Sequence, residues 1–263
     1  MEPIGAYADD LRLALDIADL VDALTVANFA SEQLTIELKP DDTPVTAVDR
    51  EAEQLVRREI ATARPADAFV GEEYGATGDS ARQWIVDPID GTKNYIRQVP
   101  VWATLIALVD RGVPVVGVVS APALGRRWFA AAGAGAWGSS PTAPVHRLSV
   151  SSASTLAEAS LSYSSLSGWE ARGLLPAFLD LTRSVWRTRA YGDFWSYMMV
   201  AEGQVDLACE PELALHDMAA LVPIVEEAGG RFTSLGGEPG PFGVDALATN
   251  GMLHDAALRS LQP

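Results

Sequence analysis

The chain has 263 residues, 48% of them hydrophobic, so it can form one large domain or two packed halves with a sizeable core. Its formal net charge of −16 argues against nucleic acid and anionic membranes as partners, because both bind basic surfaces. The single cysteine, Cys209, excludes an intrachain disulfide, and we find neither a signal peptide nor an apolar run of membrane-spanning length, so we expect a cytoplasmic protein.

The first residues predict two helices separated by a strand and a polar loop. Apolar residues recur at helical spacing over about 9–30, which favours an amphipathic helix. Apolar and polar residues alternate over 34–38, as in a strand, and residues 39–44 are polar. A second helix is expected over about 45–63.

The middle of the chain predicts a sheet of consecutive strands. Apolar runs separated by short polar or glycine-containing links are typical of strands that pair with their neighbours, antiparallel where the link is a tight turn. These runs cover residues 69–73, 84–86, 101–109, 113–119 and 126–130. Two prolines then loosen the chain at 141–144, so we expect an α+β half over residues 1–146.

The remaining residues, 147–263, predict a second half in which strands and helices alternate. Strands are expected at 159–164, 185–188, 205–209, 231–235 and 246–249. Helices are expected at 170–184, 193–202, 218–229 and after Met252. This alternation is typical of an α/β layer with a partly parallel sheet.

The carboxylates best placed for chemistry lie in one stretch, W-I-V-D-P-I-D-G-T-K-N-Y. Its apolar start predicts a buried strand that Pro88 ends, because proline lacks the N–H that strand pairing needs. Asp87 and Asp90 then share a tight loop, and carboxylates are ligands that Mg²⁺ takes in proteins. The amides of Gly91 and Thr92, with the Thr92 hydroxyl, are suited to receive a phosphate. The alternative is a plain turn, because Asp, Pro and Gly are common turn residues.

Three further acidic positions have a structural explanation beside a functional one. Thr46-x-x-Asp49 matches a capping box, in which Asp49 would close the start of a helix. Glu72 and Glu73 follow a short strand, so we expect only one of them to reach a shared site; the alternative is a solvated acidic loop. Asp217 begins a helix, where the helix dipole alone favours an acid.

Together these motifs resemble the inositol monophosphatase-like family, the Mg²⁺-dependent, lithium-sensitive sugar phosphatases. The family signature D-P-[IL]-D-G-T-x-N-[FY] is present at 87–95, G-E-E at 71–73, and the late D-x-A-A motif at 217–220 with E-A-G-G at 227–230. His216 replaces the tryptophan of the late motif, and we expect it to pack or hydrogen-bond, because Mg²⁺ prefers oxygen. The resemblance covers nearly the whole chain and implies an α+β/α/β fold, a layered α-β-α-β-α sandwich.

The resemblance also implies roles in the hydrolysis of a small phosphate monoester without a covalent intermediate. Two or three Mg²⁺ ions would be held by four carboxylates and one backbone carbonyl. These ligands are Glu72, Asp87, Asp90, Asp217 and the carbonyl of Ile89. Asp49 and Thr92 would orient the attacking water and, with Glu72, form the catalytic set, while Gly91 and Thr92 would bind the phosphate.

Further residues look like the histidinol-phosphatase branch typical of actinobacteria. Lys93 and Arg97 stand where many inositol phosphatases carry Thr and His, and the runs 118–124 and 189–194 also resemble that branch. We therefore expect histidinol phosphate as the substrate and, from the family, a homodimer. The alternatives are an inositol-1-phosphate phosphatase, a nucleotide 3′-phosphatase and an inactive regulatory relative.

Three residues of the second half are candidates for binding the alcohol part of the substrate: Asp193, Glu210 and Arg189. Histidinol phosphate carries an ammonium and an imidazole, and the two acids could accept hydrogen bonds from these groups. The alternative for Asp193 and Glu210 is that they are surface or strand-end acids, because exposed carboxylates are the default.

Overall fold

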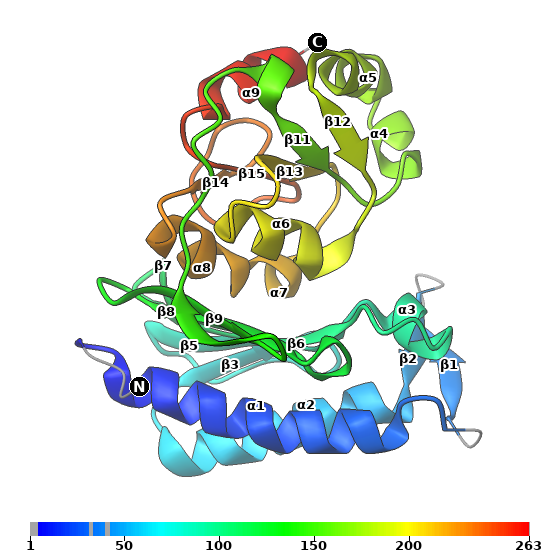
Figure 1. The fold of residues 1–263 in the computed structure, drawn as a ribbon. Coiled ribbons are helices and arrows are strands. Elements are labelled where there is room, and N and C mark those ends of the chain that lie inside the picture. The colour runs from blue at the N-terminus through cyan, green and yellow to red at the C-terminus, as the bar shows by residue number, and fades with distance from the viewer. Residues whose placement is uncertain (1–4, 32–33, 40–42, 263) are drawn as a thin grey trace.

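Five layers of secondary structure make up the protein in the computed structural model, which describes residues 5–31, 34–39 and 43–262. Helices and sheets alternate from one outer face to the other (Figure 1). One outer layer contains α1 (Ala8–Asn28) and α2 (Ala47–Ala63), and the opposite one contains α4 (Ser167–Ala171), α5 (Leu175–Ser184) and α9 (His254–Leu261). The predicted α-β-α-β-α sandwich is confirmed.

The first helical layer packs an apolar stripe against the larger sheet. The buried residues of α1 recur at helical spacing and include Leu11, Ala14, Ile17, Ala18 and Val21. Leu20, which the spacing places on the apolar face, is instead 47% exposed. Between the two helices, β1 (Ile36–Leu38) pairs antiparallel with β2 (Pro44–Thr46), so α2 begins two residues later than predicted.

The larger sheet has eight strands in the order β10-β9-β8-β7-β6-β5-β3-β4. The strands are β3 (Ala68–Gly71), β4 (Gly75–Thr77), β5 (Arg82–Asp90), β6 (Ala103–Asp110), β7 (Val113–Ala121), β8 (Arg126–Ala131), β9 (Gly135–Ser140) and β10 (Ala143–Arg147). All neighbours pair antiparallel except β3 and β5, which are parallel. The predicted antiparallel pairing of the strands at 101–109 and 113–119 is confirmed.

The prediction that Pro88 ends its strand is wrong, because β5 continues to Asp90. The pairing of β5 with β6 shifts register between Asp87 and Asp90, which accommodates a residue without an N–H. On the other side of β5, pairing with β3 extends only to Val86, so Pro88 has no partner strand there. The Pro88 carbonyl instead accepts a hydrogen bond from the Thr104 hydroxyl at 2.8 Å.

The second sheet has five strands in the order β12-β11-β13-β15-β14 and is parallel over β12-β11-β13 only. These are β11 (Ser160–Ser162), β12 (Arg187–Arg189), β13 (Leu207–Glu210), β14 (Arg231–Thr233) and β15 (Ala246–Thr249). The helices between the sheets are α6 (Asp193–Ala201), α7 (Leu215–Met218) and α8 (Leu221–Glu227) (Figure 1). Shorter elements are α3 (Thr92–Ile96) and two 3₁₀ turns, Pro122–Leu124 and Leu156–Glu158.

The largest core joins the eight-stranded sheet to the middle helices. Trp128 of β8 and Phe194 of α6 are buried in it, with ring centroids 6.0 Å apart. Gly117 of β7 allows α8 to approach closely, because a Cβ there would lie 2.2 Å from the Ala220 carbonyl oxygen. The middle helices therefore pack directly on the larger sheet, close to the end of β5, where the predicted site residues lie.

Two predicted helices are interrupted. The one over 170–184 is divided into α4 and α5 near Gly173, whose φ of +70° ends a helix. The one over 218–229 starts earlier, at Leu215, and forms α7 and α8. The division of the chain near residue 146 stays a prediction. Within the described ranges, no helix is both long and apolar enough to cross a membrane.

Candidate active site

A cavity of about 870 Å³ opens where the end of β5 faces the middle helices. Its wall contains all five predicted metal ligands: Glu72, Asp87, Ile89, Asp90 and Asp217. The predicted phosphate-binding residues Gly91 and Thr92 line it too, as does Asp193. Residues from the β3–β4 turn, the end of β5, α3 and α7 therefore meet around one space.

The register shift at the end of β5 sets the directions of its two carboxylates. Oδ1 of Asp87 accepts the amide hydrogen of Ile89 at 2.9 Å. Oδ2 of Asp90 accepts the amide hydrogen of Phe194 at 2.8 Å, although these residues are 104 positions apart. Asp90 thus joins the larger sheet to the first turn of α6.

Two groups of side chains bring possible metal-binding atoms within 4.8 Å of one another. One contains Asp87, Asp90 and Asp217, and the other contains Glu72, Asp87 and His216. Asp87 belongs to both groups, so its two oxygens could serve neighbouring ions. The carboxylates are hard oxygen donors, which suit Mg²⁺ and similar cations.

The electrostatics of these carboxylates also fit a cation. Burial raises the pKa of Asp87 well above its ordinary value, and the charges of Glu72 and Asp90 raise it further. Burial likewise raises the pKa of Asp90, with Asp193 and Asp217 adding to the effect. A bound cation favours the charged form of each group, so the residues present suit a metal site.

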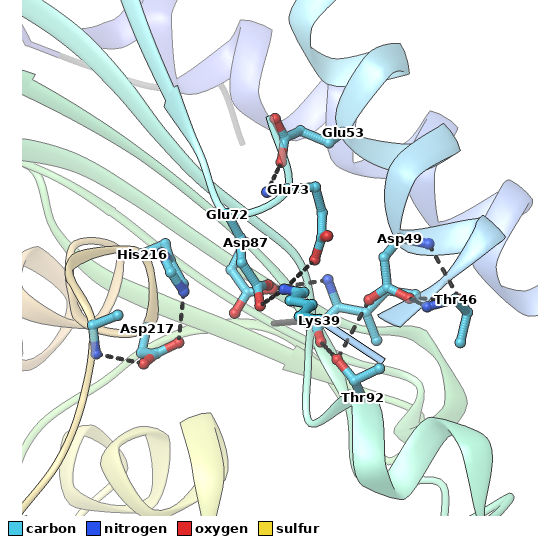
Figure 2. A network of polar contacts seen from close by, with 12 residues as sticks. Lys39, Thr46, Asp49, Glu53, Glu72, Glu73, Asp87, Thr92, His216 and Asp217 are labelled. Carbon is cyan, nitrogen blue, oxygen red and sulfur yellow. Dashed lines mark hydrogen bonds and ion pairs between the residues drawn. The ribbon is translucent and has the colours of Figure 1, made fainter. Parts of the chain in front are cut away.

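Asp49 performs the predicted capping role and also faces Thr92 (Figure 2). Its Oδ2 accepts the amide hydrogen of Thr46 at 2.8 Å, and Thr46 Oγ1 accepts those of Val48 and Asp49, so the capping box is confirmed. Its Oδ1 lies 3.4 Å from Thr92 Oγ1, which also lies 3.0 Å from the Ile89 carbonyl oxygen. Burial raises the pKa of Asp49 to about 6.

Glu72 and Glu73 both contact the ammonium group of Lys39, at 2.6 and 2.7 Å (Figure 2). As expected, Glu72 lines the cavity and Glu73 is absent from its wall, but strand alternation is not the cause. Instead, β3 ends at Gly71, and both residues belong to the turn before β4, where alternation no longer applies. Lys39 therefore lies beside a predicted metal ligand and also lines the cavity.

A side cavity of about 200 Å³ shares Asp90, Asp193 and Asp217 with the main one. Glu210 lies in its wall, 7% exposed, and accepts a hydrogen bond from the Ser164 hydroxyl. Burial raises the pKa of Glu210 to about 8 and that of Asp193 to about 6. Besides Ser164, Glu210 interacts with the hydroxyl of Tyr197 in the same wall, and both contacts partly offset the effect of burial on its pKa. Glu210 ends β13, as the strand-end alternative expected, but its burial excludes an ordinary surface acid.

Comparison with known proteins places this arrangement in a family. Residues 11–262 match the model of the inositol monophosphatase family. The chain belongs to that family. Histidinol-phosphatases of Streptomyces coelicolor and Mycobacterium tuberculosis are each 59% identical to it, over 96% of this chain and 96% and 98% of theirs. An inositol monophosphatase structure from Zymomonas mobilis superposes with a TM-score of 0.86 at 33% identity, covering 98% of this chain and 99% of that one.

Family membership and the 59% identical histidinol-phosphatases show that the protein is a phosphoric monoester hydrolase, and the family is known to depend on metal ions. The buried carboxylates described above are the residues that fit such ions. The resemblance seen in the sequence, including the histidinol-phosphatase branch, is confirmed.

Arg189 is the predicted site residue that lies apart from the others. It ends β12, is exposed, and donates to the carbonyl of Thr188 at 2.7 Å. It is absent from the walls of both cavities described above.

Sequence reasoning missed Lys39, and it did not foresee how close His216 lies to two acids. His216 Nε2 lies 3.5 Å from Asp217 Oδ1, and the ring is within 4.8 Å of carboxylate oxygens of Glu72 and Asp87. The replacement of the family tryptophan was the available signal for His216. The only sequence signal for Lys39 was its positive charge at the start of a polar loop.

Proposed function

We propose that the protein is a Mg²⁺-dependent histidinol-phosphatase, which hydrolyses histidinol phosphate to histidinol and inorganic phosphate. The observation that carries the reaction type is the pair of ligand groups joined at Asp87. The substrate is supported by the two histidinol-phosphatases at 59% identity, each matched over nearly its whole length.

Five residues would hold two or three Mg²⁺ ions: Glu72, Asp87, Asp90 and Asp217 through their carboxylates and Ile89 through its carbonyl. Bound Mg²⁺ supplies charge neutralisation at the phosphate and lowers the pKa of coordinated water. The same positive charge offsets the field of a chain whose net charge is −16 and which would otherwise repel an anionic substrate.

Asp49 and Thr92 would orient the attacking water. The Thr92 hydroxyl lies between the Asp49 carboxylate and the Ile89 carbonyl, so its rotation is restricted. Because the pKa of Asp49 is raised to about 6, the carboxylate is ionised at neutral pH and is still basic enough to accept a proton. Gly91 and Thr92, at the start of α3, would contact the phosphate.

The side cavity would bind the cationic part of histidinol phosphate. Glu210 is a buried acid whose nearby donors are the neutral hydroxyls of Ser164 and Tyr197, and a cationic donor would favour its ionised form more strongly than they do. Asp193 lies in the same wall and adds negative charge. A neutral polyol such as inositol offers hydroxyl donors only, which form weaker hydrogen bonds with a carboxylate. Arg189 stays a prediction as a substrate-binding residue.

The test is a comparison of kcat/KM for histidinol phosphate, inositol 1-phosphate and 3′-phosphoadenosine phosphate with saturating Mg²⁺. We expect histidinol phosphate to be preferred at least about tenfold, or about 1.4 kcal/mol of transition-state discrimination. A preference of tenfold or more for inositol 1-phosphate would instead reverse the substrate assignment. Absence of Mg²⁺-stimulated phosphate release from all three would indicate an inactive relative. The homodimer and the cytoplasmic location stay predictions, open to light scattering and cell fractionation.

A further inference from the structure

Glu53 is a buried carboxylate outside the predicted site, one helical turn after Asp49 on α2. Its side chain is 0% exposed, and it lies next to the turn that carries Glu72 and Glu73 (Figure 2). Burying a carboxylate is costly unless donors surround it, so its partners define what it does in the fold.

The partners of Glu53 are backbone amides of the β3–β4 turn. Oε2 accepts the amide hydrogen of Glu73 at 2.6 Å, and Oε1 accepts that of Tyr74 at 3.2 Å. Arg57, one turn further along α2, donates to Oε1 at 2.9 Å and to the Gly75 carbonyl at 3.0 Å, so it balances the charge and holds the end of the same turn.

Gly71 leaves the space that this carboxylate fills. A Cβ at Gly71 would lie 2.1 Å from Oε1 of Glu53, a separation that neither group could tolerate. Glycine is needed at position 71 because it has no side chain, and not because of its backbone conformation, since its φ is not positive.

The turn is therefore held from two sides. The Glu72 amide donates to the Val86 carbonyl of β5 at 3.3 Å, while the following two amides donate to Glu53. Between these anchors, the Glu72 side chain is directed to Asp87 and His216. Loss of the Glu53 anchor would free the turn to rotate while leaving β3 and β5 paired.

We propose that Glu53 is a positioning residue for the metal site, which fixes the 72–74 turn so that Glu72 can share an ion with Asp87. The proposal rests on the proposed function only in requiring that Glu72 binds metal. Glu53 does not touch the ion or the substrate; it acts through two backbone amides.

The test is Mg²⁺ binding to the metal-free, full-length protein by titration calorimetry, without substrate. Glu53→Ala removes both acceptor oxygens, and Glu53→Gln keeps one but places an NH₂ against an amide hydrogen. Both variants should raise the dissociation constant of the ion by about 10–100-fold, as expected when a group that orients a metal ligand is lost. At saturating Mg²⁺, kcat of each variant should be reduced by a smaller factor than the factor by which its Mg²⁺ affinity is reduced.

The matched control is Ile60→Ala, which removes a buried side chain from the same helix, away from the turn. It should lower the melting temperature and leave Mg²⁺ affinity unchanged within about twofold. If the Glu53 variants bind Mg²⁺ as Ile60→Ala does, the proposal is wrong.

Gly71→Ala tests the same idea without altering Glu53. Gly71→Ala should weaken Mg²⁺ binding as Glu53→Ala does. Combined with Glu53→Ala, it should cause little further loss of affinity, because the added methyl group then fits in the space left by the Glu53 carboxylate. Additive effects in the double variant would contradict the proposal, as would normal Mg²⁺ affinity in Gly71→Ala. A wild type that binds Mg²⁺ and fails to hydrolyse histidinol phosphate would overturn only the proposed substrate.

Discussion

Oγ1 of Thr92 lies 3.4 Å from Oδ1 of Asp49, although the two residues are 43 positions apart. The other oxygen of the same carboxylate closes the start of α2. One side chain therefore fixes a helix terminus and faces the site, so its structural and chemical roles can be separated by substitution.

Asp49→Asn should lower kcat by about 100-fold or more, because the amide is a much weaker base than the carboxylate. The melting temperature should change little, since the amide oxygen can still accept the hydrogen of the Thr46 amide. Steady-state kinetics with calorimetry would separate the two effects. Thr46→Ala is the matched control: it removes the hydroxyl of the cap, so it should lower stability by about 1 kcal/mol with a smaller effect on kcat. Normal turnover in Asp49→Asn would rule out a role for Asp49 in the reaction.

Asp90→Asn should abolish turnover and leave the fold intact. Removing one charge relieves repulsion among the buried carboxylates, so the metal-free variant should melt at the wild-type temperature or slightly above it. Mg²⁺ at 100 times its dissociation constant should stabilise the wild type by about 2.7 kcal/mol and this variant much less.

The control for Asp90→Asn is Asp180→Asn, which alters an exposed acid paired with Arg183 on α5. It should leave both turnover and the response to Mg²⁺ unchanged. Outright unfolding of Asp90→Asn would indicate a structural turn residue instead of a metal ligand.

Glu210→Gln should change substrate preference. Hydrogen bonds to charged groups contribute about 1.5–3 kcal/mol, so kcat/KM for histidinol phosphate should fall by about 10–100-fold. The fall for inositol 1-phosphate should be smaller, because a hydroxyl can donate to the amide oxygen. Glu212→Gln, an exposed acid in the same cavity wall, is the control and should affect neither substrate strongly. Equal losses for both substrates in Glu210→Gln would remove Glu210 as the cation-binding residue.

His254 should make stability depend on pH below neutrality. The imidazole is fully buried between the hydroxyls of Thr233 and Thr249, and burial lowers its pKa to about 4 from an ordinary value of 6.5. Because the unfolded chain takes up this proton more readily, the contribution is complete above pH 6.5 and is lost as pH falls toward 4.

The loss from His254 amounts to at most about 3 kcal/mol. Denaturant unfolding of the metal-free protein at several pH values would measure it. His254→Asn should flatten the curve between pH 4 and 6.5, whereas substitution of the exposed His146 should not. A wild-type slope that persists in His254→Asn would assign the acid sensitivity to other groups.

Most strands and helices followed from the sequence because their apolar runs have the period of each element. The strands β2, β4, β9 and β10 were not predicted, and β10 begins within the stretch at 141–144 that was expected to loosen the chain. The four carboxylates proposed as metal ligands could be predicted as a set because each falls in a family motif, and all four line the same cavity. The continuation of β5 past Pro88 could not, since it depends on where its neighbours stop pairing. The shared contact of Glu72 and Glu73 with Lys39 depends on where β3 ends, and only the folded chain fixes that point.

The proposed metal ligands come from positions as far apart as Glu72 and Asp217, and the Asp90 carboxylate accepts a hydrogen bond from the first turn of α6. A complete set of these ligands therefore exists only after the middle helices have docked on the larger sheet. We expect this docking to occur late in folding, because it joins segments that are far apart in the sequence. Interactions absent from the folding transition state slow unfolding and leave the folding rate unchanged. In stopped-flow experiments, Mg²⁺ should accordingly lower the unfolding rate of the protein and leave its refolding rate unchanged. The ion would then stabilise the folded state kinetically without helping the chain to fold.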